Sequence, residues 1–205
     1  GFNTFDVHNG IGRADLAGSH TSSRLIKLGD TDITDVKARG RYVYWSGTGG
    51  IGRARLDGTH VQRHFIPAES NLEWADGGLV VTSTHIYWTN TSLHTIGRAN
   101  RDGSQVELRF IRHQPVTGPI STDGVQLFWA VHKSHGDRID RASLSGTRID
   151  SSFVSGGRGY GAMAVHESHL YYANSRGIGR VRLNGSANQP GYLHDHVRCG
   201  IAIAH

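Results

Sequence analysis

The chain has 205 residues and a mass of 22.3 kDa, with 28 glycines, four prolines and one cysteine, Cys199. A single cysteine excludes an intrachain disulfide and a cysteine-based zinc site, and abundant glycine without a Gly-X-Y period indicates dense turns rather than collagen. The net charge of +5 comes from arginines spread along the chain, which argues against nucleic-acid binding. We also expect no membrane span, and nothing at the N-terminus resembles a signal peptide; if the protein is exported, this sequence is expected to be its mature form.

One four-residue sequence motif, called the phrase below, recurs five times along the chain. Ile-Gly-Arg-Ala stands at 11–14, 51–54 and 96–99, with variants at 139–142 and 178–181, at spacings of 40, 45, 43 and 39 residues. In chain order, each phrase leads into a turn of small residues at 17–19, 57–59, 102–104, 145–147 and 184–186. An aromatic segment precedes the later four phrases, at 42–45, 86–88, 127–129 and 170–172. Such a period of about 40 residues predicts a repeat architecture.

Each unit is predicted to consist of β-strands. The aromatic and β-branched segments are short, alternate in polarity and are bounded by Gly, Asn, Asp and Ser. Asp-Gly and Asn-Gly between two such segments are strong hairpin signals. Four strands in about 41 residues match one blade of a β-propeller.

The two ends of the chain predict how the ring closes. The run Gly161 to His166 is matched by Gly200 to His205, where the sequence stops. Residues 200–205 would therefore supply the inner strand of a blade whose other three strands lie at the N-terminus, with Phe5 at the aromatic position. We therefore expect an all-β fold, a five-bladed propeller of four-stranded antiparallel blades, closed by N- and C-terminal strands that share one blade.

The predicted domain organisation follows from this ring. We expect a single propeller domain over 1–205. One blade combines 200–205 with 1–28, and the others cover about 32–67, 77–112, 119–154 and 161–194.

The units resemble the YWTD propeller repeats of the low-density lipoprotein receptor family. In that family a Tyr-Trp-Thr-Asp strand precedes an Ile-x-Arg-Ala strand and an Asp-Gly-Ser turn. The best match is Ile86 to Asn90, followed by Ile96 to Ala99 and Asp102 to Ser104. The resemblance implies a propeller, although those receptors have six blades and the final Asp of the motif is absent here. The Ile-Gly-Arg-x-x-x-x-Gly phrase is also similar to repeats of the streptogramin B (virginiamycin B) lyases.

Two repeated positions have competing interpretations. The aromatic ladder could form sugar-stacking platforms, but we favour core packing because neighbouring sheets need large side chains between them. Its members are Phe5, Trp45, Trp88, Trp129 and Tyr172. The arginines of the phrase could form an anion-binding ring. We favour a bracing role, in which each arginine contacts a neighbouring blade or carbonyl while its stem covers apolar surface.

Histidine is unusually frequent, with fourteen copies, and many fall in loops that should meet on one rim. His194 and His196, with nearby His132 or His135, could bind a divalent transition metal, because neutral imidazole suits such ions. Solvated loop histidines are the simpler interpretation. We expect no cofactor otherwise, and the metal remains an alternative.

Trp74 lies outside the ladder in the longest interblade loop, beside Glu73. An exposed tryptophan flanked by hydrogen-bonding groups suits a carbohydrate or peptide pocket, although a core-capping tryptophan is an alternative. We predict a non-catalytic, lectin-like, carbohydrate-binding protein that is secreted or extracytoplasmic. The candidate ligand-binding set on the rim is Trp74, Glu73, Asn90, His94, His132, His135, Asn174, Arg176, His8 and Asn9.

Two other functions compete with this prediction. One is a metal-dependent lyase or lactonase, in which the His132, His135, His194 and His196 loops converge with Glu73 or Asp195. The other is a protein-docking scaffold, which a contiguous apolar patch on one rim would favour. The sequence names no catalytic residue.

Overall fold

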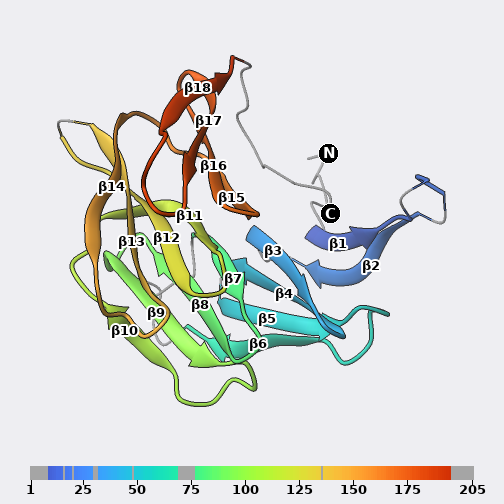
Figure 1. The fold of residues 1–205 in the computed structure, drawn as a ribbon. Coiled ribbons are helices and arrows are strands. Elements are labelled where there is room, and N and C mark those ends of the chain that lie inside the picture. The colour runs from blue at the N-terminus through green and yellow to red at the C-terminus, as the bar shows by residue number, and fades with distance from the viewer. Residues whose placement is uncertain are drawn as a thin grey trace, which may run out of the picture.

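The computed structural model describes residues 9–15, 17–19, 21–29, 32–47, 49–68, 77–134 and 136–194. Within these ranges the regular elements are antiparallel strands, arranged in four four-stranded sheets and one two-stranded sheet. Figure 1 shows the sheets following one another around a central axis, as the blades of a propeller do. The inner strand of each four-stranded sheet lies nearest that axis.

The blades are numbered I to IV in chain order. Blade I contains β3 (Ile33–Arg39), β4 (Tyr42–Gly47), β5 (Gly50–Arg55) and β6 (Gln62–Pro67). Blade II contains β7 (Leu79–Val81), β8 (His85–Asn90), β9 (Thr95–Asn100) and β10 (Glu107–Ile111). Blade III contains β11 (Val116–Thr122), β12 (Gln126–Val131), β13 (Asp137–Ser143) and β14 (Asp150–Gly157). Blade IV contains β15 (Met163–His166), β16 (His169–Asn174), β17 (Gly177–Arg182) and β18 (Gln189–Leu193). The two-stranded sheet pairs β1 (Asn9–Arg13) with β2 (Ser22–Gly29).

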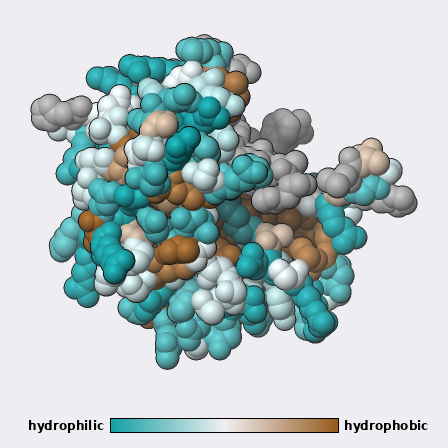
Figure 2. Space-filling view, in the orientation of Figure 1, coloured by the Kyte–Doolittle hydropathy of each residue, from teal (hydrophilic) through white to brown (hydrophobic). Residues whose placement is uncertain are grey.

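The predicted all-β propeller with four-stranded antiparallel blades is confirmed, but the predicted number of such blades needs correction. The structure shows four four-stranded blades rather than five, and the fifth sheet has two strands within the described residues. The strands predicted to complete and close that sheet lie in 1–8 and 200–205, outside the described residues. Ring closure is therefore not seen. Figure 2 shows apolar side chains between the blades and beside the two-stranded sheet, on a surface that is otherwise mostly hydrophilic.

Each aromatic strand pairs with the following Ile-Gly-Arg strand, and the glycine makes room for the ladder side chain. A Cβ atom built on Gly52 would lie 2.1 Å from Cε2 of Trp45. The same atom on Gly97 would lie 2.2 Å from Cε2 of Trp88. Trp45, Trp88, Trp129 and Tyr172 are all buried, which confirms that these ladder positions are core. Phe5 lies outside the described residues.

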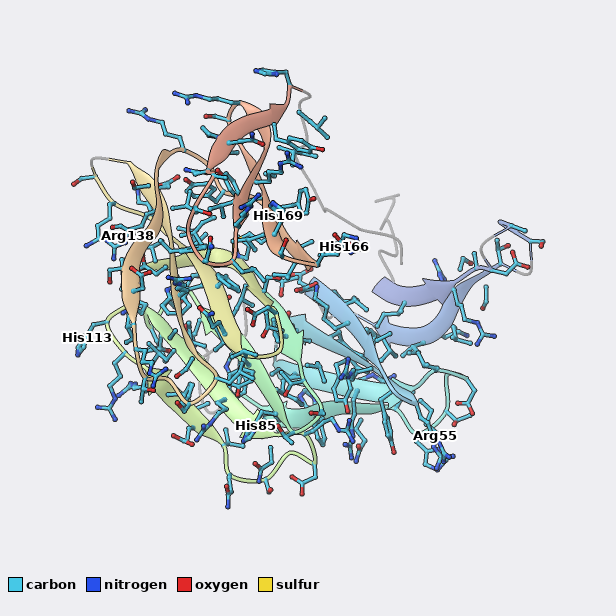
Figure 3. All side chains as sticks on the ribbon, viewed as in Figure 1. Arg55, His85, His113, Arg138, His166 and His169 are labelled. Carbon is cyan, nitrogen blue, oxygen red and sulfur yellow. The ribbon has the colours of Figure 1, made fainter. Side chains whose placement is uncertain are left out.

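Blade III departs from this pattern because Asp140 replaces the glycine. The Asp140 carboxylate is fully buried and accepts hydrogen bonds from Nε and Nη2 of Arg138, at 2.7 and 2.9 Å. It also accepts one from the backbone N–H of Ser152, at 2.8 Å. A buried charge needs such a partner, so the change from glycine is compensated within the same strand. Figure 3 labels Arg138 on this blade.

The repeated arginine fixes the outer strand of its own blade. Each guanidinium donates a hydrogen bond to a side chain nine residues later in the sequence. The pairs are Arg53 with Gln62, Arg98 with Glu107, Arg141 with Asp150 and Arg180 with Gln189. Twelve residues after each arginine stands an aromatic ring beneath the same guanidinium, at 3.7 to 4.2 Å from its centroid. The rings are Phe65, Phe110, Phe153 and Tyr192. Cation–π contact and a charge-assisted hydrogen bond together set the outer-strand register.

Some of these groups also bridge to the next blade. Arg141 Nη1 donates to the carbonyl oxygen of Leu183 at 2.6 Å, and Arg13 Nη1 donates to that of Leu56 at 3.0 Å. At the boundary between blades II and III, Tyr87 Oη donates to the carbonyl oxygen of Leu144 at 3.0 Å. The predicted bracing role of the arginines is thus confirmed at two boundaries.

A further contact repeats between blades, where an outer-strand aromatic ring packs on a turn glycine of the following blade. A Cβ atom on Gly103 would lie 2.8 Å from Cε2 of Phe65, and one on Gly146 would lie 2.7 Å from Cζ of Phe110. The glycines take positive φ angles of 90° and 75°, a region where a side chain is also disfavoured by the backbone. Glycine at this position is therefore required twice, by the turn and by the neighbouring ring.

Candidate functional site

A cavity of about 360 Å³ lies on the propeller axis, between the inner strands of all four blades. Inner strands touch one another around the axis: β3 packs on β7, β7 on β11 and β11 on β15. The lining residues are Thr34, Asp35, Lys37, Gly77, Gly78, Thr117, Gly118, Pro119, Ile120, Gly161, Ala162 and Met163. Most lie near the beginning of their inner strands, so the cavity is associated with the end of the propeller where one blade leads into the next.

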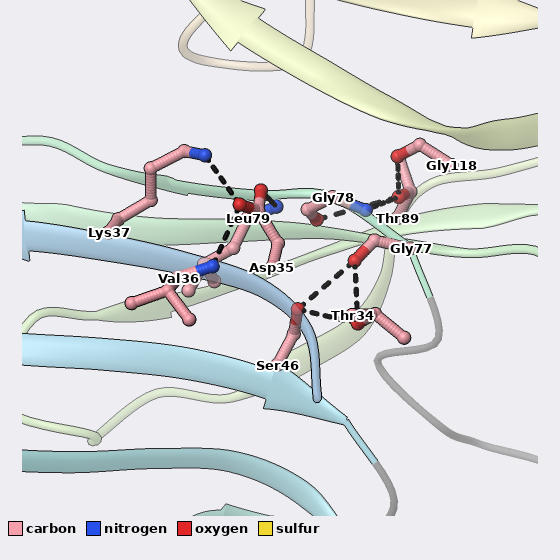
Figure 4. A network of polar contacts seen from close by, with 10 residues as sticks. All are labelled: Thr34, Asp35, Val36, Lys37, Ser46, Gly77, Gly78, Leu79, Thr89 and Gly118. Carbon is pink, nitrogen blue, oxygen red and sulfur yellow. Dashed lines mark hydrogen bonds and ion pairs between the residues drawn. The ribbon is translucent and has the colours of Figure 1, made fainter. Parts of the chain in front are cut away.

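Asp35 organises the charged side of this axial cavity. Its Oδ1 accepts hydrogen bonds from the Lys37 ammonium at 2.6 Å and from the Val36 N–H at 2.8 Å. Its Oδ2 accepts one from the backbone N–H of Leu79 at 2.9 Å, which joins β3 to β7 (Figure 4). The Lys37 side chain remains 42% exposed and the Asp35 side chain 23%. The ammonium therefore keeps donors directed at solvent while the carboxylate is held by backbone.

Hydroxyl groups support the backbone of the cavity lining beside this pair: Thr34 lines the cavity, and Ser46 and Thr89 are buried behind the lining. Thr34 Oγ1 and Ser46 Oγ each donate to the carbonyl oxygen of Gly77 at 3.1 Å. At the next boundary Thr89 Oγ1 donates to the carbonyl oxygen of Gly118 at 2.6 Å (Figure 4). Ser46 and Thr89 occupy the same place in the aromatic strand. The two boundaries therefore share one interaction, a hydroxyl group that donates to a glycine carbonyl oxygen of the next blade.

The other side of the cavity is less polar. The aromatic strands of blades III and IV carry Ala130 and Ala173 where blades I and II carry the hydroxyls. Ala162 and Met163 line the cavity on this side. The cavity thus combines a lysine with unused donors, a fixed carboxylate and an apolar wall, which suits one polar side chain on an otherwise apolar stem.

Asp35 and Lys37 were not among the residues predicted from the sequence. The signal was available, because Asp35 stands where Gly78, Pro119 and Ala162 stand in the other inner strands. Charges at alternate positions of one strand lie on one face. The charges of the inner strands, at Asp35, Lys37 and Arg39, are confined to β3, and this alternation could therefore have indicated the axis.

Two of the predicted ligand residues support turns. Asn90 is buried, and its Oδ1 accepts the backbone N–H of Leu93 at 2.8 Å. Asn174 is also buried, and its Oδ1 accepts the N–H of Arg176 while its Nδ2 donates to the carbonyl oxygen of Pro190. Both amides are engaged in β-hairpin connections, and their role in ligand binding stays a prediction.

Other predicted residues lie on the rim. His94 is exposed, with a positive φ of 55°. The His132 side chain is 69% exposed, and its Nδ1 lies 2.7 Å from Oδ1 of Asp137. Arg176 is exposed and lines a cavity of about 110 Å³ between blades III and IV, together with Asn174 and Arg158. The structure therefore brings Asn174 and Arg176 together.

The same boundary contains a pair of tyrosines. Tyr160 and Tyr172 pack edge to face, with ring centroids 5.5 Å apart. Burial raises the pKa of Tyr160 to about 12, and burial also raises the pKa of Tyr172 well above its usual value. Both hydroxyls are therefore neutral around pH 7.

The remaining predicted residues lie wholly or partly outside the described residues. These are His8, Glu73, Trp74, His135 and His196, together with the side chain of Asn9. His194 is described and exposed. Among the described residues, no three His, Cys, Asp or Glu side chains are grouped so that they could hold a metal ion. The predicted metal site depends partly on His135 and His196 and stays a prediction.

Comparison with known proteins supports the resemblance noted in the sequence. No model of a known protein family matches the chain. The chain is 28% identical to low-density lipoprotein receptor-related protein 5 from Mus musculus, over 122 residues that make up 57% of this chain and 8% of that protein. The likeness to YWTD propeller repeats is confirmed. The chain spans less than a tenth of that relative's length.

Solved structures share the fold. A nidogen/laminin complex matches with a TM-score of 0.56 and 17% identity, over 80% of this chain and 81% of the other. The extracellular domain of a hybrid two-component system from B. thetaiotaomicron matches with a TM-score of 0.60 and 14% identity, over 84% of this chain and 23% of the other. At these identities the structures support the propeller fold alone. Within the described ranges, no helix is long and apolar enough to span a membrane.

Proposed function

We propose that the chain is a non-catalytic propeller that binds a segment of a partner protein at its axial cavity. The observation that carries the proposal is the Lys37–Asp35 pair, set in a cavity of about 360 Å³ with a polar and an apolar wall. A peptide loop would place one polar side chain against Lys37 while its backbone crosses the blade-to-blade loops. The nidogen structure, solved in complex with laminin, supports the class of partner.

The test uses peptides selected from a phage-displayed library against the whole chain. We expect the selected peptides to bind Lys37→Ala at least about tenfold more weakly than the wild type, because a hydrogen bond to a charged group is lost. Lys133→Ala, which removes an exposed rim lysine, is the control and should bind as the wild type does. Equal affinity for Lys37→Ala, or failure to select any peptide, would overturn the proposal.

The lectin-like function predicted from the sequence stays a competing prediction. Its central residues Trp74 and Glu73 lie outside the described residues, and the comparisons do not support a carbohydrate partner. A glycan array separates the two functions: retention of wild type but not of Trp74→Ala would favour the lectin. We propose a location outside the cytoplasm, supported by the fold shared with an extracellular domain.

We also propose that a fifth blade closes the ring, with β18 packed against the two-stranded sheet. The repeated contact between an outer-strand ring and a turn glycine supports this arrangement. Tyr192 of β18 is the remaining ring, and it is 40% exposed. Gly18 is the remaining turn glycine, with a φ of 74° and, among the described residues, nothing within 4 Å of its Cβ direction. Tyr192 could therefore supply the ring, and Gly18 the turn glycine, of one more contact of this kind.

Cross-linking tests this closure in a Cys199→Ser background. Gly191→Cys with Ala17→Cys forms the test pair, and Arg109→Cys with Ser145→Cys forms the control at the equivalent positions between blades II and III. We expect a short bismaleimide to link both pairs within one chain. A dimer from the test pair would place a second copy at blade IV, and no product would show an open ring, so either result would overturn closure.

A further inference from the structure

A second large hollow lies between blades I and II, at the opposite end of the strands from the axial cavity. It is a groove of about 620 Å³ formed where β3 turns into β4, β7 into β8 and β9 into β10. Its lining residues are Arg39, Gly40, Arg41, Tyr42, Tyr44, Arg53, Ser83, Thr84, Asn100, Arg101 and Asp102. Figure 3 labels Arg55, the last residue of β5, and His85, the first residue of β8, and both lie at this end of their blades.

The groove is strongly cationic. Four guanidinium groups line it, against one carboxylate. That carboxylate, on Asp102, accepts hydrogen bonds from the N–H and Oγ of Ser104 at 2.9 and 2.6 Å, so it stabilises the turn between β9 and β10. These bonds lower the pKa of Asp102, and it stays ionised without neutralising the arginines by direct contact.

Three of the four arginines are available to a ligand. Arg53 is held by the Phe65 ring and by Gln62 Oε1. The side chains of Arg39, Arg41 and Arg101 are exposed and form no hydrogen bond or ion pair within the described part of the chain. Guanidinium groups left without partners in one groove repel one another, and an anion would relieve this repulsion.

The cluster is not a by-product of the repeat. At the boundary between blades II and III, the positions equivalent to Arg39, Arg41 and Arg101 hold neutral residues, namely Thr82, Thr84 and Leu144. At the boundary between blades III and IV they hold Asp123, Val125 and Leu183. The repeat supplies Arg53 alone, so the other three are specific to this groove.

The aromatic side of the groove is also specific. Tyr87, between blades II and III, donates its hydroxyl to the carbonyl oxygen of Leu144 and so ties the two blades together. Tyr44 is its equivalent in blade I, and in the described residues its hydroxyl makes no such bond. Tyr42 packs beside it, with ring centroids 6.2 Å apart. Tyr44 is itself buried, so the phenol donor that the groove offers next to the guanidinium groups is that of the half-buried Tyr42.

We propose that this groove binds a ligand that carries several sulfate or phosphate esters. Guanidinium forks match the paired oxygens of a tetrahedral oxyanion, and three of them in one groove supply enough donors for more than one such group. The hydroxyls of Tyr42 and Ser83 would donate to the remaining ester or ring oxygens. This site is separate from the axial cavity, and its occupation does not depend on the proposed binding of a protein.

Calorimetry with two probes tests the proposal: a fully sulfated heparin hexasaccharide and inositol hexakisphosphate. Desulfated hexasaccharide is the control for the sugar itself. We expect at least one charged probe to bind, and the double variant Arg41→Gln/Arg101→Gln to weaken it at least about tenfold, because charge-assisted hydrogen bonds are lost. The probe that binds more tightly identifies sulfate or phosphate as the source of the anion.

Arg109→Gln/Arg112→Gln is the matched control, because it removes the same charge from exposed positions of blade II outside the groove. It should leave the affinity within about twofold, since exposed charges away from the site are screened by salt. Equal losses in both double variants would show attraction to net charge only and would overturn the proposal. Absence of binding by either probe at low salt would also overturn it.

Discussion

The boundaries between blades I to IV and the boundary beyond blade IV are built from the same parts but differ in their contacts. In the first group Phe65, Phe110 and Phe153 each face a turn glycine of the following blade. Beyond blade IV, Tyr192 and Gly18 carry the same two halves without meeting in the described structure. The difference teaches that a ring and a turn glycine can both be present in the repeats without forming the contact, which also depends on which sheet lies beside the ring.

The largest effect is expected at a boundary that is already formed. Phe110→Ala removes a ring that packs on Gly146 and lies 4.0 Å beneath Arg98. We expect the free energy of unfolding to fall by about 3 kcal/mol, at the lower end of the range for truncating an aromatic side chain, because the ring is half-buried. Urea denaturation measures this loss, and a cost under about 1 kcal/mol would show that the contact contributes little.

Tyr192→Ala makes the equivalent change beyond blade IV. In a closed ring we expect a loss of about 2 kcal/mol, because the ring is then covered by the two-stranded sheet. The same urea titration applies, with Val125→Ala as a control for removing an exposed apolar side chain. A loss no greater than that of the control would contradict closure.

Alanine at the turn glycines gives a paired comparison with smaller effects. Gly146→Ala and Gly18→Ala begin from nearly equal φ angles of 75° and 74°, so the backbone costs about 1 to 2 kcal/mol in both. Only Gly146 has a ring against its Cβ direction in the described structure. We expect equal losses of stability if the ring closes in solution. A milder effect at Gly18 would indicate that no ring packs there.

The smallest effect is expected in alkaline solution at the boundary between blades III and IV. The raised pKa of Tyr160, about 12, lies above that of an unfolded tyrosine near 10, so the unfolded chain releases its proton first. Stability should therefore be complete below pH 10 and decrease as the pH rises from about 10 to about 12. Urea midpoints at pH 9 and pH 11 measure the decrease, which should be smaller in Tyr160→Phe. An unchanged decrease in that variant would assign it to other groups.

The repeated positions of this fold could be predicted from the sequence, because each was seen several times. Trp45, Trp88 and Trp129 recur at one place in the unit, and the structure buries all three. Repetition also identified the arginine phrase and its bracing role. The ends of the chain carried the prediction of a shared blade, but those residues lie outside the described ranges.

Features that occur in one blade only were harder to predict. Lys37 and Asp35 belong to a single inner strand, and a search for periodicity passes over them. Asn90 and Asn174 illustrate another limit, since a sequence does not show whether an amide faces a ligand or caps its own turn. Their Oδ1 atoms accept backbone N–H groups two or three residues ahead, which depends on the local loop conformation.

The ring-on-glycine contact also makes the repeats interchangeable modules. If the unit from Gly77 to Val116 were excised, Phe65 would face the turn at Gly146, which already accepts the phenyl ring of Phe110. Gene duplication or deletion can therefore change the number of repeats without inventing a new junction. A chain shortened or lengthened by one four-stranded unit would keep a ring opposite a turn glycine at that joint, so its circumference could change in steps of whole repeats.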